Sequence, residues 1–238
     1  MPFMLLPGPL KNILRGSRNG DEQIPPAGNG FVRKVTPARR SEQDEPVSTR
    51  QSRGLEEFFS NIRGQSGLHI LDLGGATQQN VSFITNLGHR LCTEDFLRIL
   101  ADVFGTEDTV DQSNPGRIDF FLRQALDYPA DEFDGVLLWD VLEYLEPSLL
   151  NAVIDRLRKV VRRRSYMLAV FHSDDKLQAA PFYTFRIQEV NTLQVTRQGM
   201  RRPAQLYNNR SLEKLFGQFD SVKFFLTRER LREVIVKV

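Results

Sequence analysis

Hydrophobic positions along the chain follow two spacings, one typical of buried strands and one typical of helices. Short continuous apolar runs predict strands at residues 68–73, 89–93, 133–139 and 166–171. Apolar residues that recur every three or four positions predict helices at 55–63, 79–87, 96–104 and 148–161. Because buried strands alternate with amphipathic helices, the pattern predicts a parallel sheet covered on both faces.

The end of the chain follows a different pattern. A predicted helix at 211–219 precedes two segments, 221–227 and 233–238, in which apolar and polar residues alternate. Only a short link separates them, which indicates an antiparallel hairpin. The fold class is therefore α/β, a Rossmann-like, doubly wound and mostly parallel sheet with a C-terminal antiparallel hairpin.

The first 53 residues lack this periodicity. They hold seven of the twelve prolines and carry a net charge of +4, whereas the rest of the chain carries −2. A segment of this composition buries too little apolar surface to offset its ordering entropy. We expect a disordered, basic, proline-rich tail at 1–53 and one domain at 54–238.

Composition excludes several classes of protein. No apolar run approaches the roughly 18 residues of a transmembrane helix. The single cysteine, Cys92, rules out an intrachain disulfide and a cysteine-built zinc site, and the three histidines are scattered, so no metal is expected. A reduced, cytoplasmic protein is expected, and the near-neutral domain makes nucleic acid an unlikely partner.

Glycine and acidic residues follow the first two predicted strands, at the edge where ligands of open parallel sheets bind. Asp72, Gly74 and Gly75 follow the first strand, and glycines let the backbone approach a ligand closely. Glu94 and Asp95 end the second, where a carboxylate can accept hydrogen bonds from both hydroxyls of a ribose. The spacing of about 20 residues predicts a nucleoside-binding half.

Two segments resemble class I S-adenosylmethionine-dependent methyltransferases. Residues 71–77, Leu-Asp-Leu-Gly-Gly-Ala-Thr, are similar to the glycine motif of that family, and Glu94-Asp95 stands at its ribose-binding acid. Residues 133–145, Phe-Asp-Gly-Val-Leu-Leu-Trp-Asp-Val-Leu-Glu-Tyr-Leu, are similar to its F-D-x-V-x-x-x-x-V-L-E-H-L segment. The resemblance covers about residues 54–238, and residues 216–234 look like a bacterial branch without a named substrate.

The resemblance implies S-adenosylmethionine as the cofactor and methyl transfer as the activity. Asp72 would orient the loop or meet the methionine ammonium, and Gly74 and Gly75 would let the backbone approach the methionine moiety. Glu94 or Asp95 would hold the ribose, and we favour Glu94. The cofactor already carries an activated methyl group, so alignment of donor and acceptor suffices without a catalytic triad.

Two positions depart from the family pattern. Ala76 and Gln78 stand where the family has its second and third glycines, and a methyl group at Ala76 narrows the room for the cofactor. The alternative hypothesis is therefore a non-catalytic protein of the same fold that binds a partner and has a degraded glycine loop.

The adenine contacts stay open. By resemblance, Gln124 would follow a third strand and meet the adenine amine. The apolar residues of 118–126 have helical spacing instead, which favours a helix and a reduced or missing third strand. The adenine contacts are thus unassigned among residues 124–127.

Four residues near the ends of the later strands have two interpretations each. Trp139 is either part of the core or pocket wall, or else a specific stacking platform. Asp140 and Glu143 have the spacing of a capping box, and Asp140 is equally a candidate ligand contact. His172 follows a strand and is a candidate general base, or else a surface histidine with satisfied hydrogen bonds.

The methyl acceptor is expected to be a small molecule bound by the segment at 179–202, where this fold inserts substrate contacts. The arginines of that segment suggest an anionic acceptor. They are Arg186, Arg197, Arg201 and Arg202.

Overall fold

The computed structural model describes residues 47–105, 111–174, 176–227 and 230–238. Its main sheet has six strands in the order β3-β2-β4-β5-β9-β8. β3, β2, β4 and β5 are parallel to one another, and β9 is antiparallel to both β5 and β8. The strands are β2 (His69–Asp72), β3 (Arg90–Thr93), β4 (Phe133–Trp139), β5 (Val161–His172), β8 (Ser221–Leu226) and β9 (Leu231–Lys237). The predicted Rossmann-like α/β fold with a C-terminal hairpin is confirmed.

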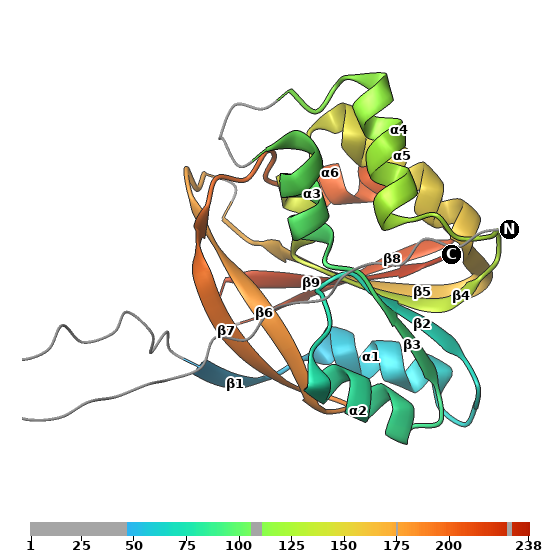
Figure 1. Ribbon diagram of the computed structural model, residues 1–238. Helices are drawn as coiled ribbons and strands as arrows, with labels where there is room; N and C mark the ends of the chain where they lie inside the picture. Colours follow the sequence, from blue (N-terminus) through green and yellow to red (C-terminus); the bar gives the residue numbers. More distant parts are fainter. Residues whose placement is uncertain (1–46, 106–110, 175, 228–229) are drawn as a thin grey trace, which may run out of the picture. The chain divides into compact units, whose positions relative to one another are not determined.

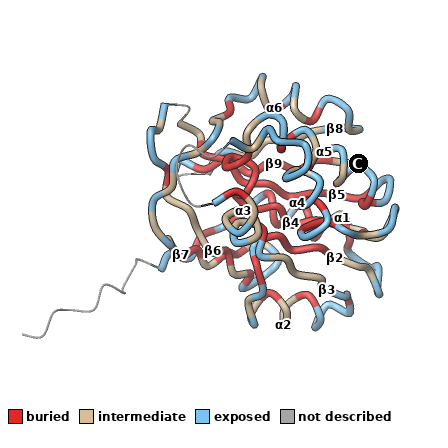
Figure 2. The backbone as a smooth tube through the Cα atoms, turned by 45° about the horizontal axis from the view of Figure 1, so that its top comes forward, coloured by how far each residue is buried: buried red, intermediate tan, exposed pale blue. Residues whose placement is uncertain are grey.

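Helices cover both faces of this sheet (Figure 1). One face carries α3 (Phe96–Phe104), α4 (Pro115–Ala125), α5 (Pro147–Val160) and α6 (Asn209–Leu215). The other face carries α1 (Arg53–Ile62) and α2 (Gln78–Asn86), while the short 3-10 helix η1 (Val141–Tyr144) follows β4. The backbone is buried mainly in the central strands, between the two helix layers (Figure 2).

Side-chain caps mark where five of the helices begin. In each, a short polar side chain accepts a hydrogen bond from the backbone N–H three residues later, which satisfies one of the free donors of the first turn. The capping residues are Ser52, Thr77, Asp95, Asn114 and Asn208. The caps at Thr77 and Asp95 begin α2 and α3 shortly after β2 and β3 end, at the carboxyl edge of the sheet.

The third strand of the family pattern is missing, as the helical spacing predicts. β3 is the edge of the sheet, and residues 115–125 form α4. The apolar side of α4 packs into the core with Phe121, Leu122 and Ala125 buried. Because an edge strand has a neighbour on one side only, its loss leaves the rest of the ladder intact.

A second sheet was not predicted. Its three antiparallel strands, in the order β1-β7-β6, are β1 (Val47–Gln51), β7 (Thr192–Arg201) and β6 (Ala180–Glu189). The boundary at residue 53 is therefore wrong, because residues 47–51 pair with β7 and Arg53 opens α1. In β1 only Arg50 is buried, so the strand has no apolar pattern that could have revealed it. The expectation for residues 1–46 lies outside the described residues.

No helix in the described ranges is long and apolar enough to cross a membrane.

Candidate functional site

The glycine loop after β2 is hydrogen-bonded to the residues that follow β3. The Gly75 N–H donates to the Glu94 carbonyl at 3.0 Å, and Gly74 forms an isolated bridge with Asp95. Gly75 has a φ of +82°, a conformation that favours glycine. The loop and the two acids predicted at this edge therefore lie side by side.

Asp72, the last residue of β2, is fully buried beside this loop and accepts hydrogen bonds from other groups of the chain. Its Oδ1 accepts from the Gly74 N–H at 2.9 Å and from the indole N–H of Trp139 at 2.6 Å. Its Oδ2 accepts from the side-chain amide of Asn80 at 2.9 Å. Burial raises the pKa of the Asp72 carboxyl, while these three hydrogen bonds oppose the rise.

Trp139 lies against the glycine loop. A Cβ added at Gly74 would come within 2.6 Å of Trp139 Cδ1 and 2.9 Å of its Nε1, so glycine is required there for the indole to fit. The ring of Trp139 is 1% exposed and stacks on Phe185, with centroids 5.0 Å apart and planes inclined by 5°. Trp139 is therefore part of the core, and it occupies the side of the loop that the resemblance assigns to methionine.

Strand β6 closes this part of the site. Asn80, in the first turn of α2, donates to the Phe185 carbonyl at 3.1 Å and accepts from the Ile187 N–H at 2.8 Å. These two bonds hold β6 against α2 and place Phe185 over Trp139. Sequence reasoning missed Asn80. It placed Phe185 only within the substrate segment at 179–202, although the apolar–polar alternation around Phe185 and Ile187 is a strand signal.

The two candidate ribose acids differ in their surroundings. Glu94 accepts a hydrogen bond from the Tyr128 hydroxyl, which also contacts Cys92 Sγ at 3.1 Å. Asp95 caps α3 through the Arg98 N–H at 3.1 Å and lines a large cavity. Successive residues of an extended segment point to opposite sides, and Asp95 is the acid that faces the cavity.

The cavity has a volume of about 1460 Å³ and lies beside α3, η1 and the end of β7. Its walls combine apolar side chains with arginine, glutamine and acidic groups. They include Leu97, Leu100, Phe104, Phe182, Met200, Leu206, Arg98, Arg201, Arg202, Gln112, Gln178, Gln205, Asp95 and Glu146. A space of this size can hold a nucleoside-sized ligand together with a second small molecule.

Behind the cavity wall lies a buried polar cluster built on η1 and β5. Glu143 Oε2 faces His172 Nδ1 at 2.6 Å, and Glu143 Oε1 accepts from the His172 backbone N–H at 2.9 Å. Asp140 Oδ2 accepts from the Tyr183 N–H at 3.1 Å and makes no cap bond. The predicted capping box is therefore wrong, because both carboxylates bind strands β5 and β6 instead.

His172 is 3% exposed, so the interpretation as a surface histidine is also wrong. Burial of the ring lowers its pKa, but the hydrogen bond and charge of Glu143, together with the charge of Asp140, outweigh burial and raise the pKa of His172. For the carboxyl of Asp140, burial disfavours the charged form and raises the pKa to about 7. His172 holds its proton more firmly than an ordinary histidine, which is unfavourable for a general base.

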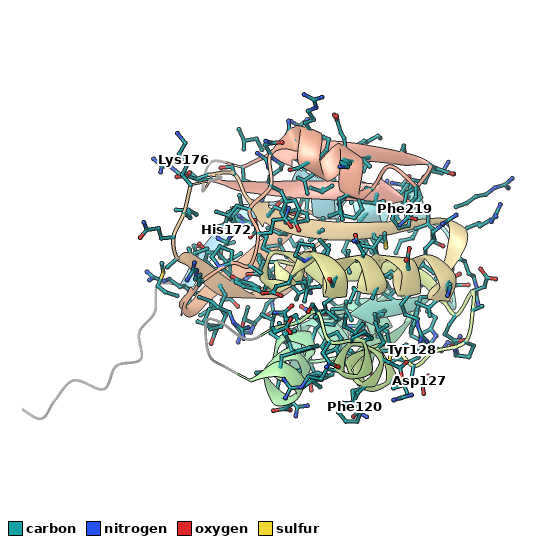
Figure 3. The ribbon with its side chains drawn as sticks, turned by 90° about the horizontal axis from the view of Figure 1, so that it is seen from above. Phe120, Asp127, Tyr128, His172, Lys176 and Phe219 are labelled. Carbon is teal, nitrogen blue, oxygen red and sulfur yellow. The ribbon has the colours of Figure 1, made fainter. Side chains whose placement is uncertain are left out.

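The other predicted residues lie outside this group. Ala76 and Gln78 are exposed at the start of α2, and Gln124 is exposed on α4 and does not line the cavity. Of the arginines in the inserted hairpin, Arg201 and Arg202 line the cavity, whereas Arg186 binds Thr196 within its own sheet. Figure 3 places Tyr128 and His172 well apart, so the surroundings of Glu94 and the His172 cluster are separate.

Comparisons with known proteins give matches among solved structures. No protein-family model and no curated protein matches the sequence. A SAM-dependent methyltransferase from Archaeoglobus fulgidus is 14% identical with a TM-score of 0.47, over 77% of this chain and 91% of that one. The 1,6-didemethyltoxoflavin-N1-methyltransferase of Burkholderia thailandensis, solved with its substrate and S-adenosylhomocysteine, is 12% identical with a TM-score of 0.44, over 77% and 76%. A SAM-dependent methyltransferase from Methanosarcina mazei is 15% identical with a TM-score of 0.43, over 73% and 93%.

Proposed function

We propose that this chain binds S-adenosylmethionine and transfers its methyl group to a small-molecule acceptor. The observation that carries the proposal is the acid-flanked glycine loop, which joins the ends of β2 and β3 beside a cavity of about 1460 Å³. Loop, acids and cavity all lie at the carboxyl edge of the sheet, where open α/β folds bind their ligands.

The adenosine half of the cofactor fits the residues present. Asp95 borders the cavity and lies beside Gly75, whose added Cβ would be 3.6 Å from the Asp95 side chain. A carboxylate has about four lone-pair sites, so the bond from the Arg98 N–H to Oδ1 and the pairing of Oδ2 with Arg98 Nε at 3.4 Å leave Asp95 able to accept from both ribose hydroxyls. Asp95 is our choice over Glu94, because Asp95 lines the cavity and Glu94 does not.

The methionine half fits only when the Trp139 indole is out of the glycine loop, because Trp139 contacts both Gly74 and Asp72. When bound, the cofactor supplies an activated methyl group. The chain has to orient the two reactants and exclude water. The apolar walls formed by Leu97, Phe104 and Phe182 serve the exclusion of water.

The acceptor we propose is anionic. Arg201 and Arg202 extend into the cavity wall from the end of β7, and the Arg201 guanidinium lies 5.3 Å above the ring centre of Tyr144. Arginine on an aromatic ring is held in a fixed orientation, which suits recognition of a carboxylate or phosphate. His172 is not proposed as a base, since its Nδ1 is bound to Glu143 behind this wall.

Calorimetric titration of the full chain with S-adenosylmethionine and S-adenosylhomocysteine tests the proposal. We expect both to bind, and Asp95→Asn to weaken binding by about ten- to a hundredfold, as for lost hydrogen bonds to a charged group. Asp102→Asn is the matched control, because Asp102 pairs with the same Arg98 but does not line the cavity. Transfer of labelled methyl to the small molecules of a cell extract reports the activity.

A non-catalytic binding protein is the second candidate. It is favoured by the Asp72 carboxylate, whose hydrogen bonds all come from the chain itself. Absence of binding at millimolar cofactor would overturn methyl transfer and leave this second candidate.

A further inference from the structure

We infer that Trp139 is a plug of the cofactor site, which the chain must withdraw from the glycine loop before the methionine end of the cofactor can enter. The inference rests on the proposed function and concerns the regulation of that same site.

The contacts of Trp139 make the plugged and the cofactor-bound arrangements mutually exclusive. The indole lies so close to Gly74 that even one added methyl group would approach it to 2.6 Å, which leaves no room for a ligand between ring and loop. The indole N–H also binds Oδ1 of Asp72, the residue that by resemblance would orient the loop or meet the methionine ammonium. This position therefore holds only one group at a time, either the indole or the amino-acid end of the cofactor.

The backbone of Trp139 is strained in the plugged arrangement. Its φ is +52°, a region that large side chains rarely adopt and that persists only where the surroundings impose it. The pairing of β4 with β5 also shifts register between Leu137 and Trp139. If the backbone of Trp139 relaxes when the indole withdraws, this strain is relieved. The strain therefore favours the open arrangement.

Two contacts hold the plug in place. The indole N–H binds Asp72 Oδ1, and Phe185 stacks on the indole. Asn80 in turn ties the β6 backbone to α2 through the Phe185 carbonyl and the Ile187 N–H. Phe182 of the same strand lines the cavity. A ligand that displaces β6 from the cavity side therefore also moves the ring that holds Trp139, which couples occupation of the cavity to opening of the plug.

The chain has a single tryptophan, so tryptophan emission, excited at a wavelength that its five tyrosines do not absorb, reports the plug alone. We expect S-adenosylhomocysteine, added to the full chain, to shift the emission of Trp139 to longer wavelength as the indole leaves its buried stack. The shift should follow the same saturation curve as the heat of binding.

Two variants test whether the stack opposes binding. Phe185→Leu removes the ring that covers Trp139, and we expect the dissociation constant for S-adenosylhomocysteine to fall about two- to tenfold, the range of an aromatic pair. Phe83→Leu is the matched control, because Phe83 packs on Phe59 against the hydrophobic cluster that contains Trp139 and Phe185. We expect it to leave the dissociation constant within about twofold of that of the unmodified chain.

Trp139→Asn completes the set, since asparagine tolerates positive φ and leaves the loop open. Suppose that the unmodified chain binds S-adenosylhomocysteine with no change in Trp139 emission, and that Phe185→Leu binds it with the same affinity. This result would overturn the plug while methyl transfer stands. Binding by Trp139→Asn alone would establish the plug and overturn methyl transfer by the unmodified chain. Failure of all these proteins to bind would overturn the proposed function and the plug with it.

Discussion

Glu143 binds His172 twice, through the His172 backbone N–H at 2.9 Å and through its Nδ1 at 2.6 Å. Both side chains are almost completely buried. The pair joins η1 to the end of β5, and the Glu143 carbonyl accepts from the N–H groups of Ala204 and Gln205 on the cavity wall. A buried pair of this kind positions the wall, and removal of one partner leaves the other uncompensated.

We therefore expect Glu143→Gln to lower the free energy of unfolding by about 3 kcal/mol. Urea denaturation measures the change. The control is His69→Gln, because His69 Nδ1 lies 2.8 Å from Glu132 Oε1 in a pair whose side chains are 16% and 31% exposed. We expect this partly exposed pair to contribute less than about 1 kcal/mol. Equal losses in the two variants would contradict a special role for the buried pair.

The carboxyl of Asp140 should make stability depend on pH. Its folded-state pKa is raised to about 7 by burial, whereas that of an unfolded aspartate is about 3.9. The folded chain thus holds this proton more firmly, and the associated stability is present below about pH 4 and lost as the pH rises to about 7. We expect the free energy of unfolding to fall by as much as about 4 kcal/mol over this window.

Asp140→Asn should flatten this dependence, because asparagine stays neutral throughout. Its free energy of unfolding relative to the unmodified chain should rise between pH 4 and pH 7. Asn in place of the exposed Asp127 serves as the control and should leave the profile unchanged. Parallel profiles for Asp140→Asn and the unmodified chain would contradict the assignment.

The sequence predicts those elements whose own residues carry the pattern. β4 and α3 have the predicted bounds, because a continuous apolar run and a clear helical repeat each mark both ends. The missing third strand also follows from local spacing, since Phe121, Leu122 and Ala125 point to one side of a helix. Asp72 and the glycine loop are placed correctly because the carboxyl ends of neighbouring parallel strands meet at one edge.

Features that depend on distant partners were not predictable. β1 pairs with β7, which is distant in the sequence, and Val47 lies opposite Thr196. No short turn joins the two strands, so no local signal indicates that they pair. The orientation of Trp139 depends on a positive φ and on Phe185 from another sheet. The apolar run indicates that Trp139 is the last residue of a strand, but only the packing shows which side of the loop it occupies.

Gly135 should be sensitive to the smallest addition. A Cβ there would lie 2.8 Å from Phe58 Cζ and 3.1 Å from Ile70 Cδ1, and both of these side chains are fully buried. We expect Gly135→Ala to lower the free energy of unfolding by about 1–3 kcal/mol, as for overpacked cores. Gly116→Ala, at the exposed start of α4, is the control and should leave stability unchanged or slightly raised. A neutral Gly135→Ala would show that Phe58 can yield.

The pairing of β1 with β7 predicts a difference between two shortened chains. A chain that begins at Val47 keeps β1, and one that begins at Ser52 loses it together with Arg50, whose guanidinium lies 3.6 Å from the buried Glu233 carboxylate. We expect the melting temperature of the second to be lower by about 5 °C or more, measured by calorimetry. Part of the loss is the charge left on Glu233, so Glu233→Gln should restore part of the stability of the chain that begins at Ser52. The same substitution should destabilise the chain that begins at Val47, where Arg50 is present. Equal melting temperatures for the two shortened chains would show that β1 contributes no stability.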